Sequence, residues 1–405
     1  MKKLLYLFLT VLIVSCNSDD ISTIGLGEDS SCPPLVFTSD YTSPWSLPFM
    51  GNNDTVPYIP DYYAVYYYFV VNDIQDQYIQ INGNYGTARY MSYNVYNADS
   101  TSTDYLSTLG SILDKEITPY CDSTNPFSLD NNGGDNSNYT VNIVPDNLGL
   151  KNQLIFGTEL TSLVVMLRYY VPEDSNGAIA GVELPSIIGK KTDMSGEIDL
   201  SFSQLNTPEV GPLEAELTLM AEVVSILSDS IGFWKLDSSS LLANKDNEYL
   251  ISPTVCSEDQ LAIIRFKPPT FNTDTDITQT KDVRYWSLNI GDAATFTYNG
   301  IKDEDATITD DGWCYVVFGR TNNQEVKDKC EELNYNYLEW RVPSDTGIII
   351  YRNLVGDPLF EGWLGNVEEF KPFEPLTVLE KLSQNYIGDS APRGRRVSIA
   401  DFLIE

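Results

Sequence analysis

The densest group of side chains that could do chemistry is an acidic stretch, DEDATITDDGW, in the second half of the chain. Its aspartates offer oxygens to Ca²⁺, a hard cation that accepts six to eight such ligands: Asp303, Asp305, Asp310 and Asp311. The spacing differs from an EF-hand loop, and no glutamate stands at the closing position. We therefore favour a solvated turn between two strands. No cofactor is required by the sequence, and Ca²⁺ is the alternative that these acids leave open.

Histidine is absent from the whole sequence. This excludes Ser-His-Asp and Cys-His catalysis and zinc sites that depend on histidine. Any reaction would have to use carboxylates, tyrosines, lysines or a bound hard cation. The 58 acidic residues supply many carboxylate pairs for glycoside hydrolysis, but the required separation of about 5 to 9 Å is not encoded in sequence. The catalytic residues are therefore unknown, and a protein without enzymatic activity is favoured.

Aromatic and basic side chains are the second kind of candidate. The six tryptophans and the tyrosines of residues 62–68 could stack on sugar rings, although core packing is their more frequent role. Arg393, Arg395 and Arg396 form a basic cluster that could bind an anion. In so acidic a chain, pairing with the protein's own carboxylates is the simpler interpretation.

Two arginine-tyrosine pairs stand in similar surroundings. Arg89 and Tyr90 open an Arg-Tyr-x-Ser motif that recurs at Arg284 and Tyr285, and each copy is followed later by an arginine in an apolar strand, Arg168 or Arg352. A pair that recurs while its surroundings diverge indicates a shared structural task. We expect these arginines to hold backbone carbonyls or a carboxylate where a strand enters the core.

The N-terminal residues have the pattern of a lipoprotein signal. Two lysines precede an apolar run that is too short to span a membrane, and Ile-Val-Ser-Cys then matches a lipobox, so that Cys16 becomes the lipidated first residue. The acidic residues that follow favour the outer face of the outer membrane, with the periplasmic face as the alternative. Loss of residues 1–15 removes two lysines and changes the formal net charge from −33 to −35. Nucleic acid is therefore not an expected partner.

Five cysteines remain after lipidation, and their number is odd. Secreted proteins permit disulfides, yet one thiol must stay free or pair outside the chain. Cys314 and Cys330 are the first candidates for a bridge.

The predicted elements are mostly strands. Short segments rich in β-branched and aromatic residues are bounded by Gly, Pro, Asn or Asp, at residues 63–71, 77–83, 139–144, 162–171, 315–319 and 346–355. Strands at this spacing, with few helices between them, predict a mainly β fold of sandwich or jelly-roll type. One helix is predicted after Pro208, with Leu213, Leu217, Met220, Val224 and Leu227 on one face. Shorter helices are expected near 325–333 and 376–386.

The chain also repeats itself faintly. Four pairs of segments occur in the same order, and they begin at residues 63 and 261, 88 and 283, 138 and 312, and 162 and 346. We interpret the repeat as two related β-domains joined by a helical bridge. The predicted divisions are a signal peptide at 1–15, a tether at 16–34, a first domain at 35–206, the bridge at 207–250 and a second domain at 251–405.

Several of these motifs resemble a family of uncharacterised secreted or envelope bacterial proteins with duplicated β-domains. They are Arg-Tyr-x-Ser at 89–92, Leu-Arg-Tyr-x-x-Pro at 167–172, Val-Glu-Leu-Pro at 182–185, Ile-Tyr-Arg-Asn at 350–353, Asp-Pro-x-Phe at 357–360 and Pro-Arg-Gly at 392–394. The resemblance implies a fold of duplicated β-domains and implies no catalytic residues.

These observations favour a surface-anchored outer-membrane lipoprotein that acts as a binding or structural module. Its expected partners are the membrane, through the lipid, and a glycan or an envelope protein. The alternative is a carbohydrate-active hydrolase or lyase that works through carboxylates.

Overall fold

The computed structural model describes most of the chain beyond the N-terminal region. The described residues are 35, 44–51, 60–128, 137–175, 178–205, 215, 217–222, 228–236, 242–273, 276–292, 296–370 and 380–405. Leu35–Glu405 is one compact unit, separate from Met1–Pro34. Cys16, which we expect to be lipidated, and the predicted signal and tether therefore lie outside the described residues.

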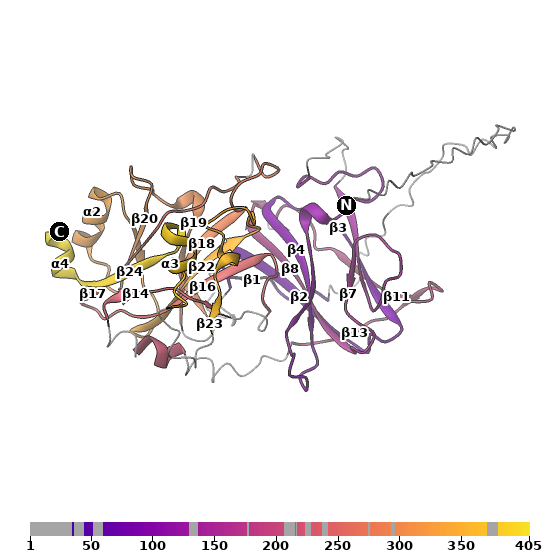
Figure 1. Ribbon diagram of the computed structural model, residues 1–405. Helices are drawn as coiled ribbons and strands as arrows, with labels where there is room; N and C mark the ends of the chain where they lie inside the picture. The colour runs from indigo at the N-terminus through magenta and orange to yellow at the C-terminus, as the bar shows by residue number, and fades with distance from the viewer. Residues whose placement is uncertain are drawn as a thin grey trace, which may run out of the picture. The chain divides into compact units, whose positions relative to one another are not determined.

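The first half of the compact unit contains two sheets (Figure 1). The strand order of one sheet is β1 (Phe49–Met50), β2 (Ala64–Asn72), β8 (Ser162–Pro172), β4 (Ala88–Asn97) and β5 (Thr108–Leu113), with β13 (Ser201–Ser203) also on β2. The order of the other is β12 (Glu197–Ile198), β11 (Ser186–Lys191), β3 (Gln77–Asn84), β6 (Asn138–Val144) and β7 (Gln153–Ile155). A separate two-stranded ladder joins β9 (Asp174–Ser175) to β10 (Ala178–Ile179).

The second half repeats this arrangement. One sheet has the order β16 (Asn247–Val255), β22 (Thr346–Leu354), β18 (Tyr285–Gly291) and β19 (Thr297–Lys302). The other has the order β14 (Ser230–Ile231), β24 (Arg393–Ser398), β17 (Gln260–Phe266), β20 (Cys314–Gly319) and β21 (Asn336–Glu339). The last pair of this sheet is parallel, as β6 and β7 are in the first half. A short parallel ladder joins β15 (Lys235–Leu236) to β23 (Glu369–Phe370).

The alternation of side chains along each strand builds two sandwich cores. In β4, Met91, Tyr93 and Val95 point into the core between the two sheets of the first half. Trp286 and Leu288 of β18 point into the corresponding core of the second half. Successive residues of a strand face opposite ways, so the residues between them cover the other face of each sheet. The predicted mainly β fold with two related sandwiches is confirmed.

A third apolar cluster joins the two halves. It contains Tyr90 and Tyr170 from the first half together with Tyr285 and Leu354 from the second. The rings of Tyr170 and Tyr285 meet edge to face, with their centroids 5.6 Å apart. Strands β4, β8, β18 and β22 are therefore buried on both faces, which explains why their sequences are almost continuously apolar or aromatic.

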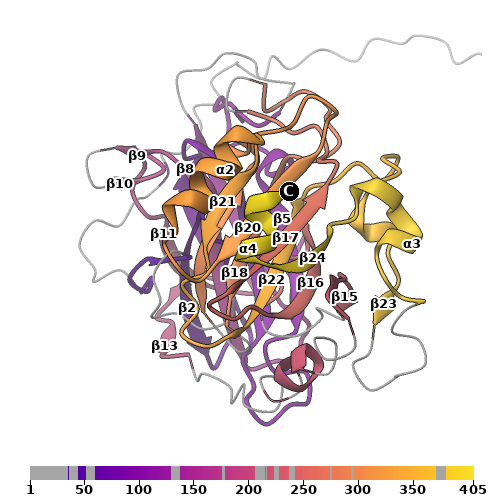
Figure 2. The ribbon, with the colours of Figure 1, turned by 90° about the vertical axis from the view of Figure 1, so that its left-hand side faces the viewer.

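Helices cover the far face of the second sandwich (Figure 2). Helices α2 (Gln324–Glu332) and α4 (Ile399–Ile404) pack Val326, Cys330 and Phe402 against the sheet that contains β17 and β20. Helix α2 begins where the side chain of Asn323 accepts hydrogen bonds from two backbone N–H groups, as a helix cap does. The prediction of a helix near 325–333 is confirmed by α2. Of the helix predicted near 376–386, residues 376–379 lie outside the described residues, 380–383 are not helical, and only the end falls in the short helix α3 (Gln384–Ile387).

Short 3₁₀ turns stand at corresponding places in the two halves. Turn η1 (Asp114–Glu116) follows β5 and turn η2 (Asp303–Asp305) follows β19, while η3 (Leu364–Asn366) and η4 (Gly388–Ser390) lie near the C-terminus. Turns η1, η2 and η4 contain Asp114, Asp303 and Asp389, each of which accepts a hydrogen bond from an arginine.

The predicted bridge contains strands as well as helix. Residues 217–222 are helical, and Leu217 is buried against Ile251, Ile348 and Ile350 of the second half. Strands β14 and β15 and the start of β16 lie in the same segment. Leu213, Val224 and Leu227 of the predicted apolar face lie outside the described residues. No helix within the described ranges has both the length and the apolar character needed to cross a bilayer.

The six predicted strands are all present, and three of the four repeat pairs join equivalent strands. The pair that begins at residues 63 and 261 is wrong, because β2 corresponds to β16 and β3 to β17 in the strand orders. Both segments are short apolar runs, and a run of this kind does not reveal to which sheet of a sandwich it belongs.

Candidate functional site

Three cations surround the ring of Trp313 on the second sandwich. The guanidinium carbon of Arg265 lies 4.9 Å from the centroid of the ring, the Nζ of Lys267 lies 5.3 Å from it, and the guanidinium carbon of Arg393 lies 5.3 Å from it. Each is within the range of about 6 Å for attraction between a cation and an aromatic face. Trp313 is partly exposed, and Arg265 and Lys267 are exposed.

Strand register brings these side chains together. Arg265 of β17 lies opposite Arg393 of β24 on one side and Tyr315 of β20 on the other. Its neighbours Ile264 and Phe266 point into the core, so Arg265 must project from the opposite face of the sheet. Trp313 immediately precedes β20 on the edge of this face. We call this surface, formed by Arg265, Lys267, Trp313, Tyr315, Tyr335 and Arg393, the Trp313 surface.

Asp389 is the carboxylate that pairs with cations of the Trp313 surface, and Asp311 and Glu405 act electrostatically on Tyr335 of the same surface. Asp389 of η4 accepts a hydrogen bond of 2.7 Å from Nη2 of Arg393 and lies 3.5 Å from Nζ of Lys267. The hydrogen bond from Arg393 is the main reason that the pKa of Asp389 lies below its usual value. Arg265 makes no ion pair with a carboxylate in the part of the chain that the structure describes. Lys267 and Arg393 therefore share Asp389, and Arg265 lies over the ring of Trp313 without such a pair among the described residues.

An aromatic pair adjoins these cations. The rings of Tyr315 and Tyr335 are stacked, with centroids 4.1 Å apart and an angle of 9° between their planes. Both side chains are partly exposed. Partial burial, followed by the neighbouring Tyr315, raises the pKa of Tyr335, so its hydroxyl stays protonated at neutral pH. The surface thus combines hydrogen-bond donors, positive charge and flat apolar faces, which is suited to binding.

Sequence reasoning identified only part of the Trp313 surface. Trp313 and Arg393 were among the candidates, whereas Arg265, Lys267 and the tyrosine pair were not. The available signal was the spacing of Arg265 and Lys267, because residues two apart along a strand lie on the same face.

The predicted basic cluster is divided between three carboxylates. Arg393 pairs with Asp389, Arg395 with Glu405 at 2.5 Å and Arg396 with Asp229 at 3.2 Å. The simpler interpretation, pairing with the protein's own carboxylates, agrees with these contacts.

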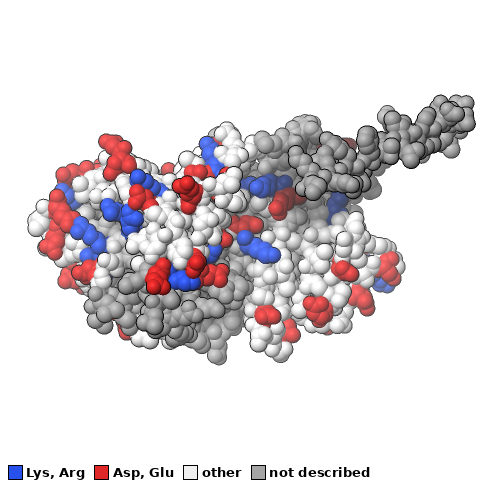
Figure 3. Space-filling model, in the orientation of Figure 1, with Lys and Arg blue, Asp and Glu red and all other residues white. Residues whose placement is uncertain are grey.

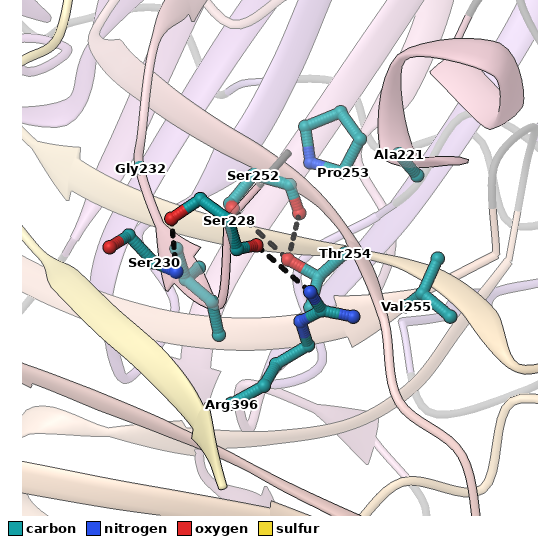
Figure 4. A pocket seen from close by; sticks show the side chains of 10 residues that line it. Ala221, Ser228, Ser230, Gly232, Ser252, Pro253, Thr254, Val255 and Arg396 are labelled. Atoms are coloured by element: carbon teal, nitrogen blue, oxygen red, sulfur yellow. Dashed lines mark hydrogen bonds between the residues drawn. The ribbon is translucent and has the colours of Figure 1, made fainter. Parts of the chain in front are cut away.

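A small hollow beside Arg396 is a weaker candidate (Figure 4). It is lined by hydroxyl groups of Ser228, Ser230, Ser252 and Thr254 and contains about 220 Å³ of space that is partly open to solvent. Arg396 donates to the carbonyl oxygen of Ser228 at 2.9 Å. Most of this space is open solvent, and the enclosed part has room for no more than about one water molecule, so the hollow is far smaller than an ordinary ligand pocket.

The two arginine-tyrosine motifs lie in the interface between the halves. Nη1 of Arg89 donates to Oδ1 of Asp303 at 2.5 Å, and its Nη2 lies 2.5 Å from Glu304. In the opposite direction, Nη1 of Arg284 donates to both oxygens of Asp114, at 2.6 and 2.8 Å. Each arginine therefore reaches a 3₁₀ turn in the other half.

Each of these aspartates also contacts its own half. Asp303 accepts a hydrogen bond from the backbone N–H of Trp286, and Asp114 accepts one from that of Met91. Burial raises the pKa of Asp303 to about 6 despite the attraction of Arg89. Burial also raises the pKa of Asp114, against the opposing effect of Arg284.

The tyrosines of the two motifs cross the interface in the same way. The hydroxyl of Tyr90 donates to Asp246 at 2.7 Å, and that of Tyr285 donates to Asp61 at 2.8 Å. The hydroxyl of Ser287 also donates to Asp61, at 2.5 Å.

Arg168 and Arg352 occupy equivalent places on β8 and β22. Arg168 lies over the ring of Tyr66 and Arg352 over that of Tyr249, at 5.8 and 5.7 Å from the centroids. Arg168 also donates to the backbone oxygen of Leu242 at 2.6 Å. All six residues predicted to have structural roles are thus buried at or near the interface.

The four aspartates considered for Ca²⁺ do not form a cage. Asp303 is directed at Arg89, Asp305 lies 3.2 Å from Lys302, and Asp311 accepts a hydrogen bond from Thr309 in an exposed turn with Asp310. The described residues include no group of three or more His, Cys, Asp or Glu placed to hold a metal ion. The stretch joins two strands, as we favoured.

The predicted bridge between Cys314 and Cys330 is wrong. Both thiols are free and buried, as is that of Cys256, whereas Cys121 is disulfide-bonded. Cys314 points into the sandwich core and Cys330 lies in the cluster beneath α2. The two thiols are therefore on opposite faces of one sheet.

Most tryptophans pack in the interior. Trp45, Trp234, Trp286 and Trp340 are buried, whereas Trp313 and Trp363 are partly exposed. The expectation of core roles is confirmed for these four, and Trp313 is the member with exposed cations around it.

The fold and this surface define a mainly β protein with two sandwiches and a site suited to binding. An uncharacterized protein from Burkholderia cenocepacia, known from a crystal structure, is similar to it over 89% of this chain and 83% of that one, with a TM-score of 0.53 and 12% identity. A Vibrio parahaemolyticus protein aligns over 74% of this chain and 86% of its own, with a TM-score of 0.40 and 9% identity. No known family and no curated protein matches the sequence. The Burkholderia protein supports the fold alone.

Proposed function

We propose that the protein is a lipoprotein of the outer membrane, exposed at the cell surface, whose two-sandwich body binds a glycan without transforming it. The observation that carries the binding role is the gathering of three cations and stacked tyrosines around partly exposed Trp313. Aromatic faces bind the apolar faces of sugar rings, and adjacent donors bind their hydroxyl groups.

The anchoring part of the proposal rests on the N-terminal sequence. The lipobox that ends at Cys16 supplies the lipid attachment, and the acidic residues after it favour the outer surface. Replacing Cys16 with alanine should move the protein from the membrane fraction to the soluble fraction. Retention of Cys16→Ala in the membrane would contradict lipid anchoring. Protease treatment of intact cells should degrade the wild-type protein, and full protection would place it on the periplasmic face.

Binding can be tested with the full mature chain, produced without the lipid, in affinity electrophoresis through gels that contain single polysaccharides. We expect at least one polysaccharide to retard the wild-type protein and Trp313→Ala to reduce the affinity at least tenfold. The matched control is Phe202→Ala, which removes an exposed aromatic ring in the first half. Equal retardation of the Trp313 variant would contradict a role for this surface.

The same experiment separates binding from catalysis. Polysaccharide recovered after long incubation should keep its length if the protein only binds it. Shortened products that disappear when one acidic residue is replaced would instead establish the alternative, a carboxylate-dependent hydrolase or lyase.

A further inference from the structure

We infer that the glycan bound by the Trp313 surface is acidic, a polymer of uronic acids, an inference that rests on the proposed binding function. Around the ring of Trp313 stand three cations, of which Lys267 and Arg393 pair with Asp389, whereas Asp311 and Glu405 act on Tyr335. The chain as a whole has a formal net charge of −33. Three cations gathered around one indole ring in such an acidic protein are therefore a feature that its composition does not explain.

The ring of Trp313 holds the cations close to one another. Like charges repel, so Arg265, Lys267 and Arg393 would separate in water if no group attracted all three. The electron-rich face of the indole supplies that attraction without adding a negative charge. The guanidinium group of Arg265 consequently keeps its capacity to bind a carboxylate through two parallel hydrogen bonds, whereas that of Arg393 already donates to Asp389.

The surroundings favour a carbohydrate among the anions. Basic and acidic side chains are interspersed over the second half in the view of Figure 3, so this face presents no broad basic surface. Nucleic acid binding depends on such a surface, because each phosphate contact adds a similar electrostatic contribution. A uronic acid polymer needs fewer contacts here, since its carboxylates pair with the cations while its ring faces contact Tyr315 and Tyr335.

The test compares two forms of one polymer. Polygalacturonate and its fully methyl-esterified form have the same backbone, and only the first carries carboxylates. In titration calorimetry with the mature chain, we expect polygalacturonate or alginate to bind at least tenfold more tightly than the esterified polymer. Raising NaCl from 50 to 500 mM should weaken the binding of the acidic polymer.

Variants locate the site. Arg265→Gln and Lys267→Gln should each weaken binding of the acidic polymer severalfold. Arg341→Gln is the matched control, because Arg341 is an exposed arginine of the same half that pairs with Glu339. A loss of affinity in the control as large as in the test variants would overturn the assignment to this surface.

The outcomes separate the inference from the proposed function. Equal binding of both forms, with sensitivity to Trp313→Ala, would overturn the acidic ligand and leave glycan binding in place. Failure to bind any polysaccharide would overturn both. Equal affinity for single-stranded DNA would show attraction to polyanions in general and would also overturn the inference.

Discussion

Arg89 of the first half and Asp303 of the second form a buried ion pair, with Nη1 and Oδ1 2.5 Å apart and neither side chain accessible to solvent. Arg284 and Asp114 repeat the pair with the donor and acceptor halves exchanged. Because each arginine directly precedes the interface tyrosine of its own motif, the two halves hold one another through equivalent residues. This reciprocity indicates that the motif serves the interface between the sandwiches.

Removing either arginine should destabilise the protein strongly and to a similar extent. Arg89→Ala and Arg284→Ala each leave a buried carboxylate without its cation, a change that typically costs about 3–5 kcal/mol. We expect a loss of this order in the free energy of unfolding, measured by urea denaturation of the mature chain at pH 7. Lys267→Ala, at an exposed cation, should change it by less than about 1 kcal/mol.

A double variant tests the pairing itself. Arg89→Met combined with Asp303→Asn removes both charges and should cost less than the sum of the single changes. Additive losses would show that the two side chains are not coupled.

The stability should depend on pH through Asp303. Burial raises its pKa to about 6 in the folded protein from 3.8, its ordinary value. The folded state therefore retains the proton more strongly, and the stability that this proton contributes is present below about pH 4 and lost as the pH rises through 6. The contribution of this proton to the free energy of unfolding is at most on the order of 3 kcal/mol, because each unit of pKa difference corresponds to about 1.4 kcal/mol.

Asp303→Asn is the reference for this measurement. As the pH rises from 4 to 7, the free energy of unfolding of the wild type should fall relative to that of the variant. Parallel pH profiles would contradict a raised pKa at Asp303.

The interface tyrosines can be tested by removing single hydroxyl groups. Tyr90→Phe and Tyr285→Phe keep the rings but deprive Asp246 and Asp61 of a donor, which should cost about 1–3 kcal/mol each. Tyr169→Phe is the matched control, since its buried hydroxyl has no hydrogen-bond partner among the described residues. Thermal denaturation should show lower transition temperatures for the first two variants and no decrease for the control.

The thiols of Cys314 and Cys330 should be unreactive in the folded protein. Burial raises the pKa of each to about 12, and a protonated, inaccessible thiol is a poor nucleophile. Mass spectrometry after alkylation should find both unmodified under native conditions and both modified in urea without reductant. A peptide that links Cys314 to Cys330 would contradict the free thiols.

Local sequence was sufficient to predict the strands and α2. Residues 162–171 and 346–355 are recognisable as strands because β-branched and aromatic side chains fill them, and α2 lies where a short helix is predicted near 325–333. The order of the repeat was also visible for three of the four pairs. The fourth was misread, since apolar runs such as residues 63–71 and 261–267 are similar whichever sheet they join.

The candidate site, too, was only partly predictable from the sequence. The sequence indicated Trp313 and Arg393 as residue types suited to binding, but the proximity of Arg265 depends on the register between β17 and β24. Likewise, the spacing between Cys314 and Cys330 suggested a bridge that the sheet between them prevents.

The sequence by itself determined the composition-dependent properties: the exclusion of histidine chemistry, the acidic charge, the mainly β fold and the recurrence of Arg89-Tyr90 at Arg284-Tyr285. Only the tertiary structure decided that Arg89 meets Asp303, 214 positions away. The physical reason is that alternation along a strand fixes which face a side chain occupies. The packing of whole sheets decides which surface lies opposite that face.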